Sequence, residues 1–422
     1  MEIEKLEALI NIPNRENFGN LVIFTIVLYF ISISVLFFSY KKNFLFLFLA
    51  GNLLRILFFT SNLSLSDDFN RFLWDGFMVD QFFDPYSISP IQVATESIPE
   101  NLLPIFEKLN SKEFYSVYPM VSEGIFWLVY KLGYNETSWI LFFRSIVWVF
   151  ELGILGILYK MEKQKGTHHL YSGIFFLSPY ILMESFLNLH LETFMAFFIL
   201  LAIYYFEKQK QFLQIFYSAL ATLVKPSSLL LVLPPAVSII RDTNSRKKYF
   251  KDICLLFTAL LIFCFSFFIS KNLFFTQVEK GYGLFFHSFQ FNSIFYKPLY
   301  SFFQLFSLGY TTGIFLNSIA GGIFLYLLFR FRKSEKPIQE ILPNLLWVMI
   351  FLSVLHPWYL LPFFVVSLYY QLSTKIFLVW SVASLASYKA YSSPAFFETW
   401  VVTTILVLTY LYEKRKKSIS IF

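Results

Sequence analysis

A charged segment early in the chain carries residues that could act on a hydroxyl group or hold a phosphate. Residues 66–76 read Ser-Asp-Asp-Phe-Asn-Arg-Phe-Leu-Trp-Asp-Gly, so as a helix Asp67 and Asp68 would share a face with Arg71. Asp75 would lie one turn further along that face. A carboxylate there could act as general base toward a hydroxyl, and the arginine could hold a phosphate in bidentate fashion. Spacing alone favours a plainer interpretation, a helix start with a serine N-cap, acids at the positive end of the dipole and surface salt bridges to the arginine.

A histidine and a glutamate stand together where a later apolar run begins. His190 and Glu192 are two positions apart, so on a helix they would diverge, but at a helix entry they could converge on one pocket. Metal ligands on one helix are normally three or four residues apart, so this pair alone is a weak metal site. Spacing alone favours a polar helix cap at the membrane interface.

Two further segments could bind the sugar or the phosphate of a substrate. His356, Trp358 and Tyr359 punctuate two apolar runs, and their rings could stack on a sugar or belong to the aromatic belt at headgroup level. Lys225 stands beside a proline within an apolar run, where a lysine is costly unless it faces a partner or a cavity. It could pair with a lipid phosphate or reach the interface through its flexible stem. The sequence does not decide between these two interpretations.

The composition is that of a membrane protein. Of 422 residues, 57% are hydrophobic, 22% aromatic and 14% charged, and the mean hydropathy is +0.60. Ordinary soluble domains carry about 25% charged residues. A soluble fold of this size could not cover so much apolar surface, and disorder is excluded for the opposite reason. The two cysteines, Cys254 and Cys264, lie inside an apolar run, which excludes a disulfide framework and a cysteine metal site.

Apolar runs near the 20-residue spanning length recur along the chain. They lie at about 18–40, 43–61, 138–159, 168–186, 190–206, 253–270, 311–329, 338–355, 357–373, 376–390 and 396–412. Residues 212–240 form a run broken at Lys225, which predicts two short helices or a re-entrant hairpin, and the amphipathic segment 114–132 predicts a helix on the membrane surface. Segment 299–310 is too short to assign. We expect an all-α polytopic protein with about 11 to 14 membrane helices.

Charge divides the connections between these runs into two groups. Short basic segments, typical of cytoplasmic loops, lie at 41–42, 160–165, 241–252, 330–336 and 413–417. The polar stretch 62–113 is instead acidic. It has nine Asp and Glu against three Lys and Arg, a net charge of −6. It predicts a large first external loop within a single integral membrane domain, 1–422. The overall charge of +7 is therefore topological and does not indicate nucleic-acid binding.

Taken in order, these segments resemble the GT-C superfamily of membrane glycosyltransferases, most closely bacterial mannosyltransferase-like proteins that use polyprenyl-phosphate sugars. The resemblance covers roughly residues 67–359 and rests on Asp67-Asp68, Arg71, Trp74-Asp75-Gly76, Asp84-Pro85-Tyr86, Tyr118-Pro119, His190 with Glu192, Lys225, and His356 to Tyr359. The chain departs from the family pattern at Phe72, Asp84, Met120, Leu189 and Glu192, where the family has Tyr, Asn, Pro, Gly and Asp.

The resemblance implies a GT-C type fold with its active site in the external loop, and transfer of a mannose-like hexose from a polyprenyl-phosphate sugar to a hydroxyl on a glycan, lipid or protein acceptor. Asp68, or Asp67, would deprotonate the hydroxyl, which attacks the anomeric carbon with inversion. Arg71, with Lys225 or a histidine, would offset charge on the leaving lipid phosphate. The other substrate-binding candidates are Trp74, Asp75, Tyr86, His190, Glu192, His356, Trp358 and Tyr359. No cofactor is implied with certainty and no metal ligand is assigned, although a divalent metal ion at the adjacent acids stays open.

Two other classes of function stay open. A transporter or flippase of a lipid-linked or small polar substrate would carry ionisable residues in mid-span, and the candidates are Arg55, Arg144, Glu151 and Glu184. A long acidic external loop is not expected in that class. A catalytically inactive GT-C-like protein would keep the spans and tolerate loss of the acid pair. Short loops predict an integral protein of a bacterial inner membrane, in contact with membrane lipids and with its site facing the periplasm; an endoplasmic-reticulum membrane is the alternative.

Overall fold

The computed structural model describes residues 18–39, 43–61, 65–94, 98–241, 280–281, 283–287, 289–372, 375–389 and 397–419. Within these ranges every regular element is a helix, and one isolated bridge joins Phe291 to Val354. The expected all-α class is therefore confirmed for this part of the chain. The run predicted at 253–270, most of the basic segment 241–252 and both cysteines lie outside the described residues.

The helices follow the predicted apolar runs closely, with η marking short 3₁₀ or π segments. The first half contains α2 Phe18–Ser39, α3 Phe44–Leu57, α4 Asp68–Asp80, α5 Pro90–Ala94, η1 Glu100–Leu102, α6 Leu103–Lys108, α7 Met120–Leu132, α8 Glu136–Lys165, α9 Leu170–Leu177, α10 Pro179–Ile181, η2 Leu182–Leu187, α11 Glu192–Glu207, α12 Gln211–Val224, η3 Pro226–Ser228 and α13 Leu229–Arg241. The second half contains α16 Leu284–His287, α17 Tyr296–Gln304, η5 Gly309–Thr311, α18 Thr312–Phe331, α19 Pro337–Ile341, η6 Leu342–Asn344, α20 Leu345–Ile350, η7 Pro357–Leu360, α21 Leu361–Tyr369, α22 Ile376–Ala383, η8 Ser384–Tyr388 and α24 Phe397–Ile419.

Three described helices are long and apolar enough to cross a membrane alone, namely Phe18–Ser39, Glu136–Lys165 and Gly309–Phe331. A fourth span results if Leu170–Leu177 and Pro179–Leu187, which meet at a 41° bend, count as one. Five shorter apolar helices, Phe44–Leu57, Gln211–Val224, Pro226–Ser238, Pro357–Tyr369 and Ile376–Tyr388, cover other predicted runs. Membrane association follows from these elements, whereas the expected count of 11 to 14 spans stays a prediction.

The surface of α2 suits a hydrocarbon environment. Its side chains Ile23, Phe30 and Phe37 are 64%, 74% and 72% exposed, and no charged residue occurs in the helix. Exposed apolar surface of this extent is rare on soluble monomers and is ordinary where a helix faces lipid. The exposed face of α2 is therefore suited to contact with lipid.

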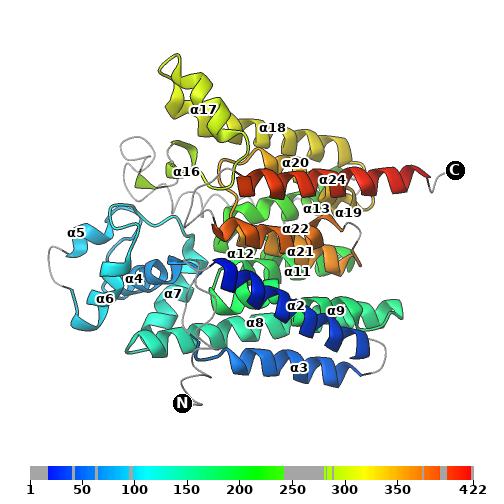
Figure 1. The fold of residues 1–422 in the computed structure, drawn as a ribbon, viewed down its shortest axis with the longest axis horizontal. Helices are drawn as coiled ribbons and strands as arrows, with labels where there is room; N and C mark the ends of the chain where they lie inside the picture. The colour runs from blue at the N-terminus through cyan, green and yellow to red at the C-terminus, as the bar shows by residue number, and fades with distance from the viewer. Residues whose placement is uncertain are drawn as a thin grey trace.

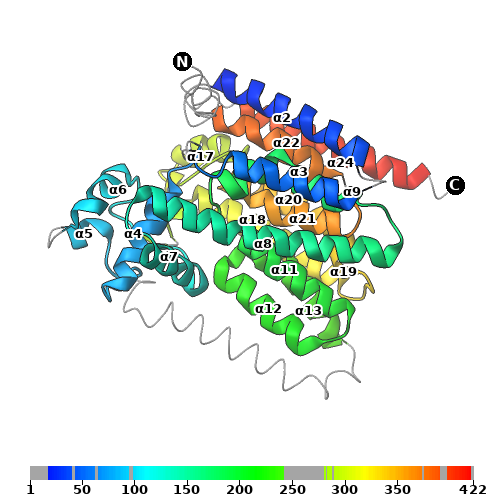
Figure 2. The same ribbon diagram turned by 90° about the horizontal axis from the view of Figure 1, so that it is seen from below.

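The helices form a bundle with a separate helical unit at one end. Helices α4 to α7 gather at the left end of Figure 1, and the bundle helices extend from there toward the end at which α24 and the C-terminus lie. In Figure 2, α2 and α24 run along one side of the bundle and α12 and α13 along the other. We call residues 65–94 and 98–132 the acidic unit. The segment predicted as an external loop is thus largely helical.

Close packing between α4 and α7 holds the acidic unit together. A Cβ atom at Gly76 would lie 2.3 Å from the backbone oxygen of Phe126, so the absence of a side chain allows the two helices to touch. Phe72, one turn earlier on α4, stacks on the ring of Phe126 at 4.5 Å. The glycine of the Trp-Asp-Gly sequence is therefore a packing residue.

Two arginines within the bundle are fully buried and bind the chain itself. Arg55 Nε donates to Glu151 Oε2 at 2.7 Å, and its Nη1 donates to the carbonyl of Phe176 at 2.8 Å. Arg144 Nη1 instead donates to the carbonyls of Phe59 and Ser61, both at 2.7 Å. These contacts join helices α3, α8 and α9 and give the mid-span charges a structural role.

Candidate functional site

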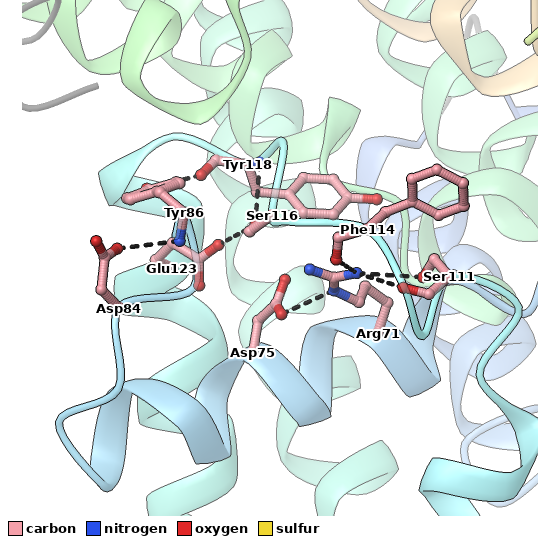
Figure 3. Close-up of polar contacts among 9 residues, drawn as sticks. All are labelled: Arg71, Asp75, Asp84, Tyr86, Ser111, Phe114, Ser116, Tyr118 and Glu123. Atoms are coloured by element: carbon pink, nitrogen blue, oxygen red, sulfur yellow. Dashed lines mark hydrogen bonds and ion pairs between the residues drawn. The ribbon is translucent and has the colours of Figure 1, made fainter. Parts of the chain in front are cut away.

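Arg71 is buried and binds the chain itself (Figure 3). Its Nε donates to Asp75 Oδ1 at 2.7 Å, and its Nη1 donates to the carbonyls of Ser111 and Phe114 at 3.0 and 2.9 Å. The side chain of Arg71 is only 7% exposed and that of Asp75 is fully buried. The expectation of a surface salt bridge at Arg71 is therefore wrong, because segment 111–114 folds back over the guanidinium. Arg71, paired with Asp75, fixes that segment, and the predicted substrate contacts of both residues stay without support.

A second buried acid lies beside this pair. Ser116 Oγ donates to Glu123 Oε1, and Glu123 on α7 is 5% exposed. Burial raises the pKa of Glu123 well above the ordinary carboxyl value, and the negative charge of Asp75 raises it further, while the serine hydrogen bond and Arg71 lower it. Burial also raises the pKa of Asp75, opposed by the charge of Arg71. Two neighbouring acids in one buried position favour retention of a proton.

Tyr86 joins two loops of the acidic unit. Its hydroxyl donates to the carbonyl of Tyr118 at 2.8 Å, and its backbone N–H donates to Asp84 Oδ1 at 3.0 Å. The other oxygen of Asp84 accepts from Ser87 Oγ at 2.7 Å. The Asp-Pro-Tyr sequence is thus an Asx-type turn that fixes the loop, and the predicted contact of Tyr86 with substrate stays a prediction.

Trp74 belongs to the core of the acidic unit. Its side chain is fully buried and packs against the rings of Phe77 and Phe106, with centroids 5.3 and 4.9 Å away. Aromatic packing of this kind stabilises the fold. The structure therefore gives no support for the predicted contact between Trp74 and a substrate.

Lys225 and Glu192 form an ion pair across a helical hairpin. The lysine lies where α12 ends and a proline begins η3, and the glutamate is the first residue of α11, so both occupy breaks between helices. Lys225 Nζ binds Glu192 Oε1 and lies 4.1 Å from the centre of the Tyr359 ring. The Lys225 side chain is 20% exposed and the Glu192 side chain 2%. We call Lys225, Glu192 and Tyr359 the lysine site.

A stack of rings adjoins the lysine site. The ring of His190 lies 3.8 Å from that of Trp358, whose other neighbour is the ring of His356 at 4.2 Å. The histidine reaches this position because Leu189 has a φ of 60°, a left-handed conformation that reverses the chain after the π segment. His190 contacts Trp358 and Glu192 contacts Lys225, and their convergence on one substrate pocket stays a prediction.

Asp68 connects the acidic unit to the lysine site. Its carboxylate lies close enough to act electrostatically on Lys225, Tyr359 and Tyr118. It is the first residue of α4, and its backbone N–H donates to Ser66 Oγ at 3.3 Å. A cap at Ser66 would start the helix at Asp67. The helix instead starts at Asp68, with Asp67 at the N-cap position. Three segments that are distant in the sequence meet at this point.

Sequence reasoning did not identify the groups behind His190. Nδ1 of His190 lies 3.2 Å from Glu184 Oε2, and the same oxygen accepts from the hydroxyl of Tyr388 at 2.8 Å. Glu184 stood out only as a charge in mid-span, and a tyrosine carries little signal in a chain with 26 of them. Among the described residues, no hydrogen-bond partner is found for His190 Nε2.

The described residues contain no group of three or more His, Cys, Asp or Glu side chains arranged to hold a metal ion. Comparison with known proteins adds no family, because no protein-family model, curated protein or solved structure matches the chain. The assignment of a function therefore rests on the residues and their geometry.

Proposed function

We propose that the chain is a GT-C type glycosyltransferase of a bacterial inner membrane. It would transfer a mannose-like hexose from a polyprenyl-phosphate sugar to an acceptor hydroxyl, with inversion, on the periplasmic side where the acidic unit lies. The observation that carries the proposal is the position of Lys225 on Glu192 and the ring of Tyr359, with the carboxylate of Asp68, from a distant segment, near enough to act on Lys225 electrostatically. A base, a phosphate-binding cation and stacking rings are the groups that this reaction requires.

Each group has one task in the proposed reaction. Asp68 accepts the proton of the acceptor hydroxyl as its oxygen attacks the anomeric carbon, and the bond to the lipid phosphate breaks. Lys225, partly exposed, faces the departing phosphate and offsets its added charge. Glu192 keeps Lys225 in place, while the stacked rings of His356 and Trp358 support the ring of Tyr359, which packs against the sugar. Arg71 acts indirectly, because it holds segment 111–114 beside α4.

The proposal favours Asp68 over Asp67 as the base. Asp68 acts on Lys225 and Tyr359 electrostatically, whereas Asp67, which occupies the N-cap position of α4, is not among the described charges that act on Tyr359. A base must lie within reach of the proton that it removes. The acid facing the lysine site therefore fits the role better.

The experiment is transfer of radiolabelled sugar from short-chain polyprenyl-phosphate mannose, glucose and arabinose by membranes that contain equal amounts of each variant. Asp68→Asn should lower the transfer rate about 100-fold or more, because it removes the general base. Asp67→Asn should have a smaller effect. Asp80→Asn is the matched control, since Asp80 lies at the far end of the same helix and pairs with the exposed Lys131.

The outcomes separate the proposal from its alternatives. Equal transfer by wild type, Asp67→Asn and Asp68→Asn would exclude the proposed site. Movement of the lipid-linked sugar across the vesicle membrane, without transfer of the sugar to an acceptor, would favour a flippase. Absence of both activities with every donor, in protein that is folded, would favour an inactive GT-C-like protein.

A further inference from the structure

A groove that shares no residue with the lysine site opens between α18 and α20. Its volume is about 400 Å³, within the range of small-molecule sites. Most of the lining is apolar and includes Ile323, Leu327 and Trp347, while Arg330 and Asn344 add polar groups. The amide of Asn344 is already engaged, because its Oδ1 accepts from the hydroxyl of Tyr410 and its Nδ2 donates to the backbone carbonyl of Glu340. Arg330 is therefore the charged group available to a ligand.

The charge of Arg330 is not neutralised by the part of the chain that the structure describes. The side chain is exposed, and its described contact is with the ring of Phe331, 5.7 Å from the guanidinium carbon. Segment 330–336 carries four basic residues and one acid. A cationic group in basic surroundings at the mouth of an apolar groove calls for an anionic ligand with an apolar portion.

The position of the groove matches a lipid molecule in its membrane orientation. Helix α18 belongs to one of the membrane-length elements, and its outer side chains Leu325 and Phe329 are 66% and 64% exposed. Arg330 occupies the last turn of that helix. The apolar lining, a turn or more earlier, therefore lies at acyl-chain depth, and the arginine lies at headgroup depth.

We propose that this groove binds one anionic phospholipid of the surrounding membrane. An acyl chain packs against Ile323, Leu327 and Trp347, and the phosphate binds the guanidinium of Arg330. Charge complementarity and continuity with the lipid-facing surface of α18 favour this occupant over a second copy of the chain. The inference is independent of the proposed transferase activity.

Native mass spectrometry of the full-length protein tests the inference by counting retained lipids. The protein is titrated with phosphatidylglycerol and phosphatidylcholine of identical acyl chains. Wild type should retain one phosphatidylglycerol preferentially. Arg330→Gln should weaken that binding about fivefold, the effect expected of one basic residue near an anionic lipid surface, and Ile323→Trp should fill the groove and weaken binding of both lipids.

Lys165→Gln is the matched control, because Lys165 is an exposed lysine at the end of α8, outside the groove. It should bind phosphatidylglycerol as wild type does. If Lys165→Gln and Arg330→Gln lose phosphatidylglycerol binding equally, general surface charge explains the binding and the inference is overturned. Equal retention of both lipids in all variants would indicate an adventitious lipid only, and a dimer that Ile323→Trp dissociates would assign the groove to a second copy. A thermal unfolding scan of each variant confirms that it is folded.

Discussion

Arg71, Asp75 and Glu123 show how individual charges organise the acidic unit. The arginine holds segment 111–114 through carbonyl groups, and one acid pairs with it at 2.7 Å. The second acid has no cation of its own within the described residues and accepts a hydrogen bond from Ser116. Removing such an acid from water favours its neutral form. Stability of the acidic unit should therefore depend on pH through Glu123.

We expect Glu123→Gln to remove part of the pH dependence of stability. Because burial raises the pKa of Glu123 in the folded protein, the native state binds more protons than the unfolded state above the ordinary carboxyl pKa of 4.5. The stability contributed by this group is thus present below that pH and is lost as pH rises toward the folded pKa. Glutamine can keep the hydrogen bond from Ser116 and stays neutral, so the variant should gain in melting temperature over wild type as pH rises from 5 to about 8.

Thermal unfolding in detergent, followed across that pH range, measures the difference. Glu107→Gln, which changes an exposed acid on α6, should follow the wild-type pH profile. The charges that act on Glu123 come from Asp75, Arg71 and Asp84. A Glu123→Gln profile parallel to wild type would show that this carboxyl ionises alike in the folded and unfolded states.

The sequence could predict the pairing partner of Arg71 but not its burial. Asp75 stands four residues after Arg71, within reach on any helix. Segment 111–114, forty residues away, covers the guanidinium only after the intervening loop has folded, and helical spacing carries no information about that event. For the same reason, the role of Trp74 in the core could not be told from a role in binding.

At the scale of elements, the contact between α4 and α7 sets the position of Asp68. Gly76 permits this contact, since its Cα lies against the Phe126 backbone. Gly124, on the facing helix, has no heavy atom within 4 Å of a Cβ built on it. The two glycines therefore offer a direct comparison between a packing glycine and one in open space.

Gly76→Ala should destabilise the protein by roughly 1–3 kcal/mol, as overpacking does, despite the better helix propensity of alanine. Gly124→Ala should leave stability unchanged or raise it by up to about 1 kcal/mol. Melting temperatures in detergent give both values. Equal melting temperatures for the two variants would mean that α4 and α7 can separate without cost.

Hydropathy predicted where most of the helices lie, because burial in lipid or protein selects apolar residues over the whole length of each helix. Helices α12 and α13 lie on either side of Lys225, as expected for the broken run 212–240, and its interpretation as a re-entrant hairpin stays a prediction. The partnership of Lys225 with Glu192 was beyond reach, since it requires the packing of α11 against α12. The approach of both to Tyr359 depends on a further chain crossing, which spacing does not encode.

At the scale of the whole molecule, α8 runs from the acidic unit to a last turn that carries basic residues. Its 30 residues correspond to about 45 Å, more than the roughly 30 Å hydrocarbon core. It starts at Glu136, which pairs with Lys108 of the acidic unit, and its last turn carries Lys163 and Lys165. We therefore predict that the two ends of α8 lie on opposite sides of the membrane.

Single cysteines at Glu107 and Lys165, in a chain whose Cys254 and Cys264 are replaced by serine, test this orientation. A membrane-impermeant maleimide should label Glu107→Cys in intact cells and Lys165→Cys only after the membrane is permeabilised. The cysteine-free chain controls for background. Labelling of both positions from the same side would contradict the predicted orientation.

The contacts of Arg144 also constrain the order in which the chain enters the membrane. Its guanidinium donates to the carbonyl of Phe59, which is synthesised before α8. It also donates to the carbonyls of Phe186 and Leu187, which are synthesised after α8. An arginine at the centre of an isolated membrane helix costs about 2.5–3.5 kcal/mol. Helix α8 is apolar enough to cross a membrane alone, but Arg144 lacks these carbonyl partners until the bent pair has followed it. We therefore expect the bent pair to stabilise α8 in the membrane.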